Sequence, residues 1–193
     1  MLRTTPDEGH APALPRARLE NLFRRLVAAL TRVRASPADQ AWAAALLQPA
    51  ELDLWRRLSS HDQHHSIEVA RGVERRLAGT PYAGDGRWLG AALLHDIGKL
   101  AAGLNAAERV LATLLGKVVR LRTAGRWAAA ASGPRRRLGL YLTHGPAGAC
   151  AIRSAGGREE IAAWAEVHQR LPCPEVAVVP GPVARALSES DLE

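Results

Sequence analysis

The sequence predicts an all-α protein, and three observations support that class. Apolar residues recur at the three- and four-residue spacing of helices along most of the chain. β-Branched residues are sparse, and the best strand candidate, residues 176–179, is a short run between Pro174 and Pro180. Hydrophobic residues make up 47% of the 193 residues and charged residues 23%, which excludes an intrinsically disordered protein. A chain of this length can bury a core without disulfide staples.

The N-terminal part of the chain is predicted to contain an arm and three helices. Residues 1–16 lack periodicity and are rich in proline, so we expect a mobile arm. Apolar positions in residues 17–33 recur at helical spacing with arginines on the other face, which indicates an amphipathic helix. Two further helix starts follow, a Ser-Pro pair at residues 36–37 and a proline at residue 49. We assign residues 17–60 to an N-terminal helical extension.

The remaining chain, residues 61–193, is predicted to form the core of the bundle. Glycine or proline punctuates most of the helix boundaries, and no repeat of fixed period is present. Residues 87–100 are apolar almost all the way round, which is typical of a helix buried in a core. The expected helices cover residues 60–78, 87–100, a segment that starts at the N-cap Asn105, residues 138–154 with a hinge at Gly145-Pro146, and residues 158–169 and 182–192.

Positive charge is concentrated in one part of the chain. The net charge is +7, and residues 110–152 contain seven cations and no acid, so the rest of the chain is neutral. All but two of the 26 cations are arginine, a bias typical of a GC-rich gene, so basicity alone does not indicate nucleic-acid binding. The basic segment of residues 117–137 has two alternative interpretations. They are a solvated basic linker, or a surface that binds nucleic acid or an anionic membrane.

The cysteine content and the hydropathy pattern predict a soluble, cytoplasmic protein. Cys150 and Cys173 have neither a metal-ligand nor a redox spacing, so we expect a reducing compartment. The N-terminus lacks the apolar core of a signal peptide. No uncharged apolar run reaches the roughly 20 residues that a membrane span requires.

The most informative residues are His95 and Asp96, which end the apolar stretch of residues 87–100. Burying an unpaired carboxylate costs several kcal/mol, so the Asp96 side chain must meet a cation. Lys99, about one helical turn away, is the simplest partner. A divalent metal ion is the alternative, because it could bind the imidazole and the carboxylate together.

A second polar cluster lies at residues 61–68. His61 and His65 are four residues apart and share a helix face, with Glu68 one turn further on. His64 is expected to be a neighbour of His65 and not a ligand. The alternative for the whole cluster is a histidine-rich surface helix.

These two segments resemble the HD-domain superfamily of metal-dependent phosphohydrolases. The resemblance is carried by His65-Ser66 with Val69-Ala70, and by the run Leu-Leu-His-Asp-Ile-Gly-Lys at residues 93–99. The family pattern is a histidine, a His-Asp pair and a distant aspartate, and the resemblance covers about residues 61–193. It implies an HD-domain helical bundle with an N-terminal helical extension. It also implies metal ligands at His65, His95, Asp96 and Asp191, the last being the only aspartate after Asp96.

Members of the family that bind two metals have further histidines, which His144 and His168 resemble. The binuclear cyclic-dinucleotide phosphodiesterases carry two adjacent histidines and a Gly-Tyr-Pro signature at the second position. This chain instead has Val167 before His168 and Gln169-Arg170-Leu171-Pro172 after it. The departures argue against cyclic di-GMP as the substrate. This chain also has His61 where some binuclear members have a glutamate.

The resemblance implies hydrolysis of a phosphomonoester or phosphodiester, with a nucleotide as the commonest substrate class. A mixed nitrogen and oxygen ligand set favours Mn, Fe, Co, Ni or Zn over Mg, as one or two ions. With two ions, Asp96 is the natural bridging ligand. Such a metal lowers the pKa of bound water. We expect His95, Asp96 and Lys99 to be catalytic, with Lys99 placed to contact a phosphate.

Two other functions compete with this interpretation. A (p)ppGpp-type pyrophosphohydrolase is less favoured, because no Glu-Asp pair lies between Leu100 and Asp191. A regulatory module that binds metal or nucleotide without catalysis is the alternative from a different class, and Val167 in place of a second histidine favours it.

Overall fold

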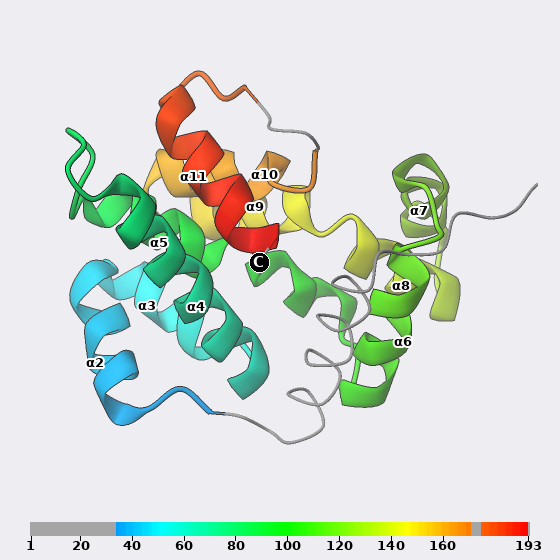
Figure 1. The fold of residues 1–193 in the computed structure, drawn as a ribbon. Coiled ribbons are helices and arrows are strands. Elements are labelled where there is room, and N and C mark those ends of the chain that lie inside the picture. Colours follow the sequence, from blue (N-terminus) through cyan, green and yellow to red (C-terminus); the bar gives the residue numbers. More distant parts are fainter. Residues whose placement is uncertain (1–33, 171–174, 193) are drawn as a thin grey trace, which may run out of the picture.

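The computed structural model describes residues 34–170 and 175–192. Within these residues the chain forms ten α-helices and one short 3-10 helix and no β-strand, so the all-α prediction is confirmed (Figure 1). The strand candidate contains only an isolated bridge between Val176 and Val179. The expected arm and the amphipathic helix of residues 17–33 lie outside the described residues.

The two helices α2 (Pro37–Leu46) and α3 (Pro49–Arg56) begin where the sequence predicts. The hydroxyl oxygen of Ser36 accepts a hydrogen bond from the backbone N–H of Asp39, which satisfies a free donor of the first turn. At α3 the carboxylate of Glu51 accepts from the backbone N–H of Gln48. The start of each helix is thus fixed by residues within one turn of it.

The centre of the fold is α5 (Gly86–Leu94), in which every residue from Trp88 to Leu94 is buried. Five helices pack against it: α2, α3, α4 (Ser60–Leu77), α10 (Glu159–Val167) and α11 (Gly181–Leu192). This arrangement explains why the apolar residues run round the whole helix, because α5 has no face toward solvent.

The predicted helix of residues 87–100 is interrupted at the His-Asp pair. The α-helix ends at Leu94, and the 3-10 helix η1 covers Ile97–Ala102. The imidazole Nδ1 of His95 lies 2.7 Å from the carbonyl oxygen of Ala92, the acceptor that a continuing α-helix would use for the N–H of Asp96. Asp96 itself has φ −95° and ψ 4°, which is not α-helical. The chain therefore turns at the residues that were expected to carry the chemistry.

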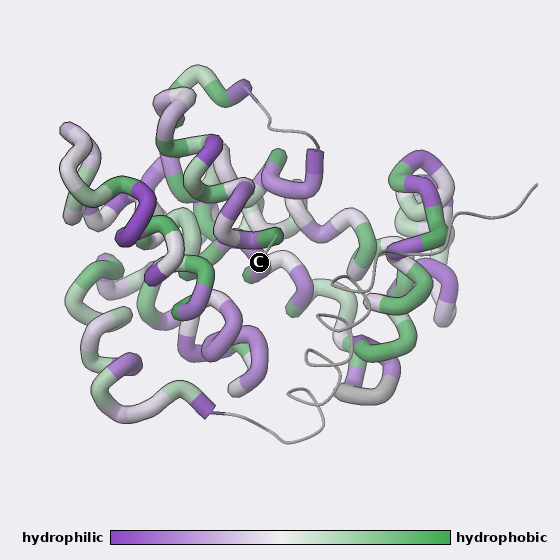
Figure 2. The backbone as a smooth tube through the Cα atoms, in the orientation of Figure 1, coloured by the Kyte–Doolittle hydropathy of each residue, from purple (hydrophilic) through white to green (hydrophobic). Residues whose placement is uncertain are grey.

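Three helices lie to one side of this body, and we call them the α6–α8 appendage. They are α6 (Ala106–Gly116), α7 (Leu121–Ala128) and α8 (Pro134–Leu142) (Figure 1). Their small buried cluster centres on Ala112 and Tyr141 and is separate from the main core. Figure 2 shows hydrophobic stretches in α6 as well as in the body. The predicted N-cap at Asn105 is confirmed, since its side chain accepts from the backbone N–H of Glu108.

The segment expected as two hinged helices is α8 followed by α9 (Gly145–Ser154), with the break just before Gly145-Pro146 as predicted. No helix in the described part of the chain combines the length and the apolar character needed to cross a bilayer.

Candidate metal centre

Six side chains predicted as metal ligands converge inside the body. They come from α4, from the turn after α5, from the junction of α8 and α9, from the end of α10 and from the last turn of α11. They form two groups, in each of which one ligand atom per residue lies within 4.8 Å of the others. The first group is His65, His95 and Asp191, and the second is Asp96, His144 and His168.

In the first group a single carboxylate oxygen faces two imidazoles. Oδ1 of Asp191 lies 3.3 Å from Nε2 of His65 and 3.4 Å from Nε2 of His95. Asp191 is two residues from the C-terminus, yet the last turn of α11 packs against α4 and lies near the middle of the molecule (Figure 1). The structure thus brings the distant aspartate to the first histidine and the His-Asp pair.

The second group is buried more deeply. Nε2 of His144 lies 2.8 Å from Oδ1 of Asp96 and 3.1 Å from Nε2 of His168. Nε2 of His168 lies 3.8 Å from the same Asp96 oxygen. All three residues are at most 9% exposed, so water does not solvate these groups freely.

Asp96 connects the two groups. Its Oδ1 faces His144 and His168, while its Oδ2 lies 3.3 Å from Nε2 of His95 and contacts the ammonium of Lys99. The six residues expected as ligands of one or two ions therefore lie in two adjacent groups, with Asp96 between them. This is the position that a ligand shared by two cations would occupy.

The imidazole orientations show that the residues fit a metal ion. The Nδ1 atoms of His95, His144 and His168 lie 2.7, 2.7 and 2.8 Å from the carbonyl oxygens three residues earlier in the chain. Since a carbonyl can only accept, each Nδ1 carries a proton and donates it. In the neutral ring the lone pair is then on Nε2, which in all three faces the cluster.

This orientation turns the Nε2 atoms toward one another and toward the carboxylates of Asp96 and Asp191. Nε2 of His95 is buried and makes no hydrogen bond with the described residues. Nε2 of His144 lies 2.8 Å from Oδ1 of Asp96 and 3.1 Å from Nε2 of His168, so an added proton on the ring or a bound cation is needed to satisfy these atoms together. A buried polar atom without a partner costs about 1–3 kcal/mol. A cation in each group would remove that cost, so these nitrogen and oxygen donors can hold metal ions.

The charges around the cluster keep three of its residues, His168, Asp96 and Asp191, in the protonation states that bind a metal ion. Burial, together with the neighbouring His144 and His95, lowers the pKa of His168 to about 3, so that ring is neutral. Burial raises the pKa of Asp96, but His95 and Lys99 more than offset it and hold that pKa well below its usual range. Burial likewise raises the pKa of Asp191, but His95 and His65 outweigh it and keep it low.

The pKa of His95 is shifted in the opposite direction. Burial lowers it, but the carboxylates of Asp96 and Asp191 outweigh burial and raise it well above its ordinary value. In the protein alone this imidazole is therefore the positive partner of two carboxylates. A metal ion binding there displaces a proton, so metal affinity increases with pH.

Three other predicted polar residues are placed around the centre and not within it. Lys99 forms an ion pair with Asp96, and its side chain is 18% exposed. Burial lowers the pKa of Lys99, but Asp96 outweighs burial and raises it, so the ammonium is charged. Nδ1 of His64 lies 3.4 Å from Glu68, outside both groups. His61 is also outside them, and burial is the main cause of its lowered pKa.

Two glycines allow the elements that carry the ligands to approach closely. A Cβ on Gly98 would overlap the carbonyl oxygen of His144 and lie 2.6 Å from the backbone nitrogen of Gly148. A Cβ on Gly145 would lie 2.6 Å from the carbonyl oxygen of Glu166. Backbone-to-backbone contact of η1 with α9, and of α9 with α10, is what brings His144 to its partners.

Gln169 is a positioning residue that sequence reasoning missed. Its Oε1 accepts from the backbone N–H of Gly145 at 3.1 Å, and its Nε2 donates to the carbonyl of Leu142 at 2.9 Å. The amide thereby joins the end of α8 to the start of α9 on either side of His144. A glutamine after a helical histidine is common on surfaces, so no sequence signal distinguishes it.

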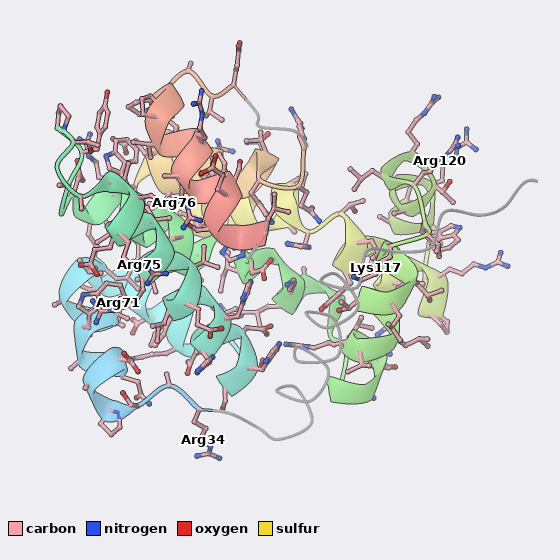
Figure 3. The ribbon with its side chains drawn as sticks, viewed as in Figure 1. Arg34, Arg71, Arg75, Arg76, Lys117 and Arg120 are labelled. Atoms are coloured by element: carbon pink, nitrogen blue, oxygen red, sulfur yellow. The ribbon has the colours of Figure 1, made fainter. Side chains whose placement is uncertain are left out.

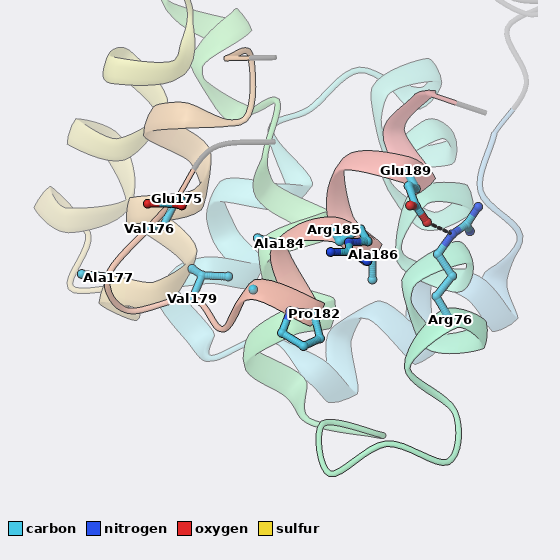
Figure 4. A pocket seen from close by; sticks show the side chains of 11 residues that line it. Arg76, Glu175, Val176, Ala177, Val179, Pro182, Ala184, Arg185, Ala186 and Glu189 are labelled. Carbon is cyan, nitrogen blue, oxygen red and sulfur yellow. Dashed lines mark ion pairs between the residues drawn. The ribbon is translucent and has the colours of Figure 1, made fainter. Parts of the chain in front are cut away.

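A large groove elsewhere does not belong to this centre. It has a volume of about 1080 Å³ and lies between α11 and the segment of residues 175–179, with Arg76 and Glu189 paired at 3.5 Å on one side (Figure 4). The six candidate ligands are not among its lining residues.

The fold and the site define an all-α protein with a buried histidine and aspartate cluster that can hold metal ions. Comparisons of the chain with protein-family models, curated proteins and solved structures found no match. Membership of the HD-domain superfamily therefore stays a prediction from the motifs.

Proposed function

We propose that this chain is a metal-dependent phosphohydrolase of the HD-domain type. The reaction is the hydrolysis of a phosphomonoester or phosphodiester, with a nucleotide as the substrate class and the cytoplasm as its compartment. The observation that carries the proposal is the apposition of His144 and His168, whose buried Nε2 atoms face each other at 3.1 Å beside Asp96. A bound cation would satisfy both nitrogens and the Asp96 carboxylate at once.

His65, His95 and Asp191 would hold one ion, and Asp96, His144 and His168 a second, with Mn, Fe, Co, Ni or Zn favoured by the imidazoles. When bound, such ions supply a water of lowered pKa and neutralise phosphate oxygens.

The protein residues orient these groups and give the substrate one direction of entry. Backbone carbonyls fix the imidazole rings of His95, His144 and His168. The side chains of His65 and Asp191 are 21% and 34% exposed, whereas the second group is almost fully covered. A phosphate therefore reaches the centre from the side of the first group. Lys99, charged and partly exposed, can contact an anionic substrate there while it remains near Asp96.

Metal content and turnover of the full-length protein test the proposal. Elemental analysis of the purified chain should find a bound transition metal. Addition of Mn²⁺ should then support hydrolysis of bis-p-nitrophenyl phosphate or of a nucleotide in a panel. Asp96→Ala should lose both properties, and His65→Gln should lose turnover by about 100-fold or more. His64→Gln is the matched control, because it removes the adjacent imidazole that pairs with Glu68 outside the cluster.

Each outcome has a distinct meaning. Bound metal without turnover of any substrate would overturn the proposed enzymatic activity. It would favour instead a regulatory module that binds metal or nucleotide. Absence of metal, with Asp96→Ala indistinguishable from the unmodified chain, would overturn the metal centre itself.

A further inference from the structure

Exposed aliphatic side chains gather on the α6–α8 appendage. Six large hydrophobic residues are exposed in the described part of the chain, and four of them lie between residues 111 and 121. The spacing of Leu111, Leu114 and Val118 places them on one face of α6 and of the helical turn that follows it. Leu121, the first residue of α7, is the fourth. We call the four residues together the apolar stripe: Leu111 (57% exposed), Leu114 (40%), Val118 (79%) and Leu121 (50%).

The cations beside this stripe have no acidic neighbours. Lys117, Arg120, Arg122 and Arg126 are all exposed, and none forms an ion pair with a carboxylate of the described residues. Figure 3 shows Lys117 and Arg120 on the appendage, with Arg120 extending away from the molecule. Exposed aliphatic carbon and unneutralised positive charge therefore occupy the same segment.

The exposed aliphatic side chains and the exposed cations together indicate which kind of partner this surface fits. A nucleic acid would neutralise the cations but leave the aliphatic stripe in water, and the nearby Trp127 is half-buried and not displayed for base stacking. A second copy of this face would bring more positive charge. Residues 17–33 would do the same, because they contain four arginines and a single acid, Glu20. An anionic lipid surface matches both features, with acyl chains for the stripe and phosphates for the cations.

We propose that residues 111–126 dock the protein on the surface of an anionic lipid bilayer. Leu111, Leu114 and Val118 enter the boundary between headgroups and acyl chains, and Lys117, Arg120 and Arg122 contact lipid phosphates. The docking is peripheral, because no helix of the described residues is able to cross a bilayer. It is independent of the metal centre, whose ligands lie outside this segment.

Sedimentation of the full-length protein with lipid vesicles tests the proposal. At low salt, the chain should bind vesicles of equal parts phosphatidylcholine and phosphatidylglycerol, and should not bind phosphatidylcholine alone. Arg120→Gln with Arg122→Gln should weaken partitioning about 25-fold, since each cation near an anionic surface contributes about fivefold. Val118→Gln, which removes apolar area without changing charge, should weaken it about tenfold.

Matched substitutions elsewhere make the test specific. Arg56→Gln with Arg57→Gln removes the same charge from α3 and its end, and Val178→Gln removes an exposed valine from another surface; both should leave vesicle binding unchanged. Asp96→Ala should bind vesicles like the unmodified chain. Vesicle binding can therefore be tested independently of metal binding and of the proposed hydrolysis. Equal losses in the control variants, equal binding to neutral vesicles or no vesicle binding would overturn the proposal. Binding to duplex DNA in place of vesicles would assign the segment to nucleic acid instead.

Discussion

The body of the protein and the α6–α8 appendage both contain arginines and aliphatic residues, but the two regions differ in how these side chains are paired and buried. In the body, Arg158 is paired with the buried Glu51 at 2.6 Å, and Arg153 with Glu159 at 2.7 Å. Valines and leucines of α4, α5 and α11 are buried in one core. In the appendage, most arginines have no carboxylate partner among the described residues, and Leu111 and Leu114 of α6 are exposed. The body thus buries its apolar side chains and pairs these cations, whereas the appendage exposes much of its charge and apolar surface.

The largest difference between the regions should appear when a glycine becomes alanine. Gly98→Ala forces backbone apart where η1 meets α9, so it should lower the free energy of unfolding by about 3 kcal/mol and abolish metal binding through His144. Gly125→Ala, in α7, has nothing within 4 Å of the new methyl group. It should stabilise the protein by about 0.7 kcal/mol, because alanine favours helix. Urea denaturation of both variants measures the contrast, and an equal effect of the two would contradict it.

Two glutamates that cap helices give the next contrast. Glu51 is fully buried and binds Arg158, so Glu51→Gln leaves a partly buried guanidinium without its counter-charge and should cost about 3 kcal/mol. Glu108 occupies the same capping position in α6 but pairs with Arg137 in solvent. Glu108→Gln should therefore change stability far less, since glutamine also completes the capping box. Thermal unfolding followed by circular dichroism measures the loss of stability in both variants. A larger loss in Glu108→Gln than in Glu51→Gln would contradict the prediction.

A pair of valines compares the two kinds of apolar surface. Val73 in α4 is fully buried, and Val73→Ala should destabilise the protein by about 2 kcal/mol through the lost contacts and the cavity. Val118 is 79% exposed, so Val118→Ala should change stability by less than about 0.5 kcal/mol. A large cost at Val118 in denaturant titrations would show that the apolar stripe is covered within the protein.

The smallest expected effect concerns how the free energy of unfolding changes with pH under acidic conditions. Burial raises the pKa of Glu51, but hydrogen bonds from Arg158 and from the backbone of Gln48 outweigh it and lower the pKa. A lowered pKa in the folded state contributes stability above the unfolded value of about 4.5, and this contribution is lost as the pH falls through the folded value. Glu51→Gln should thus flatten the decline of stability below about pH 5. An unchanged slope in denaturation at several pH values would assign the decline to other groups.

The features predicted correctly from sequence depend on neighbouring residues. The caps at Ser36 and Asn105 and the break before Gly145 are local, and the buried character of α5 follows from its composition. The six side chains that converge were also named in advance, because the resemblance to the HD-domain motifs and the single aspartate after Asp96 restrict the choice.

The features that were missed depend on residues far apart in the chain. The end of α5 at Leu94 follows from how η1, α9 and α10 pack. The carboxylate of Glu51 reaches Arg158 across 107 positions, and Gln169 reaches Gly145 across 24. Such pairings leave no periodic signal in a single sequence.

The central claim is that the buried histidine and aspartate cluster binds metal. Titration of the metal-free full-length chain with Co²⁺, followed by visible absorption, tests it most directly, because the absorption bands report nitrogen and oxygen ligands around the ion. We expect a saturable spectrum that is lost in Asp96→Ala, altered in His144→Gln and unchanged in His64→Gln. A chain that shows no cobalt spectrum, or whose spectrum is the same in all three variants, would contradict the account.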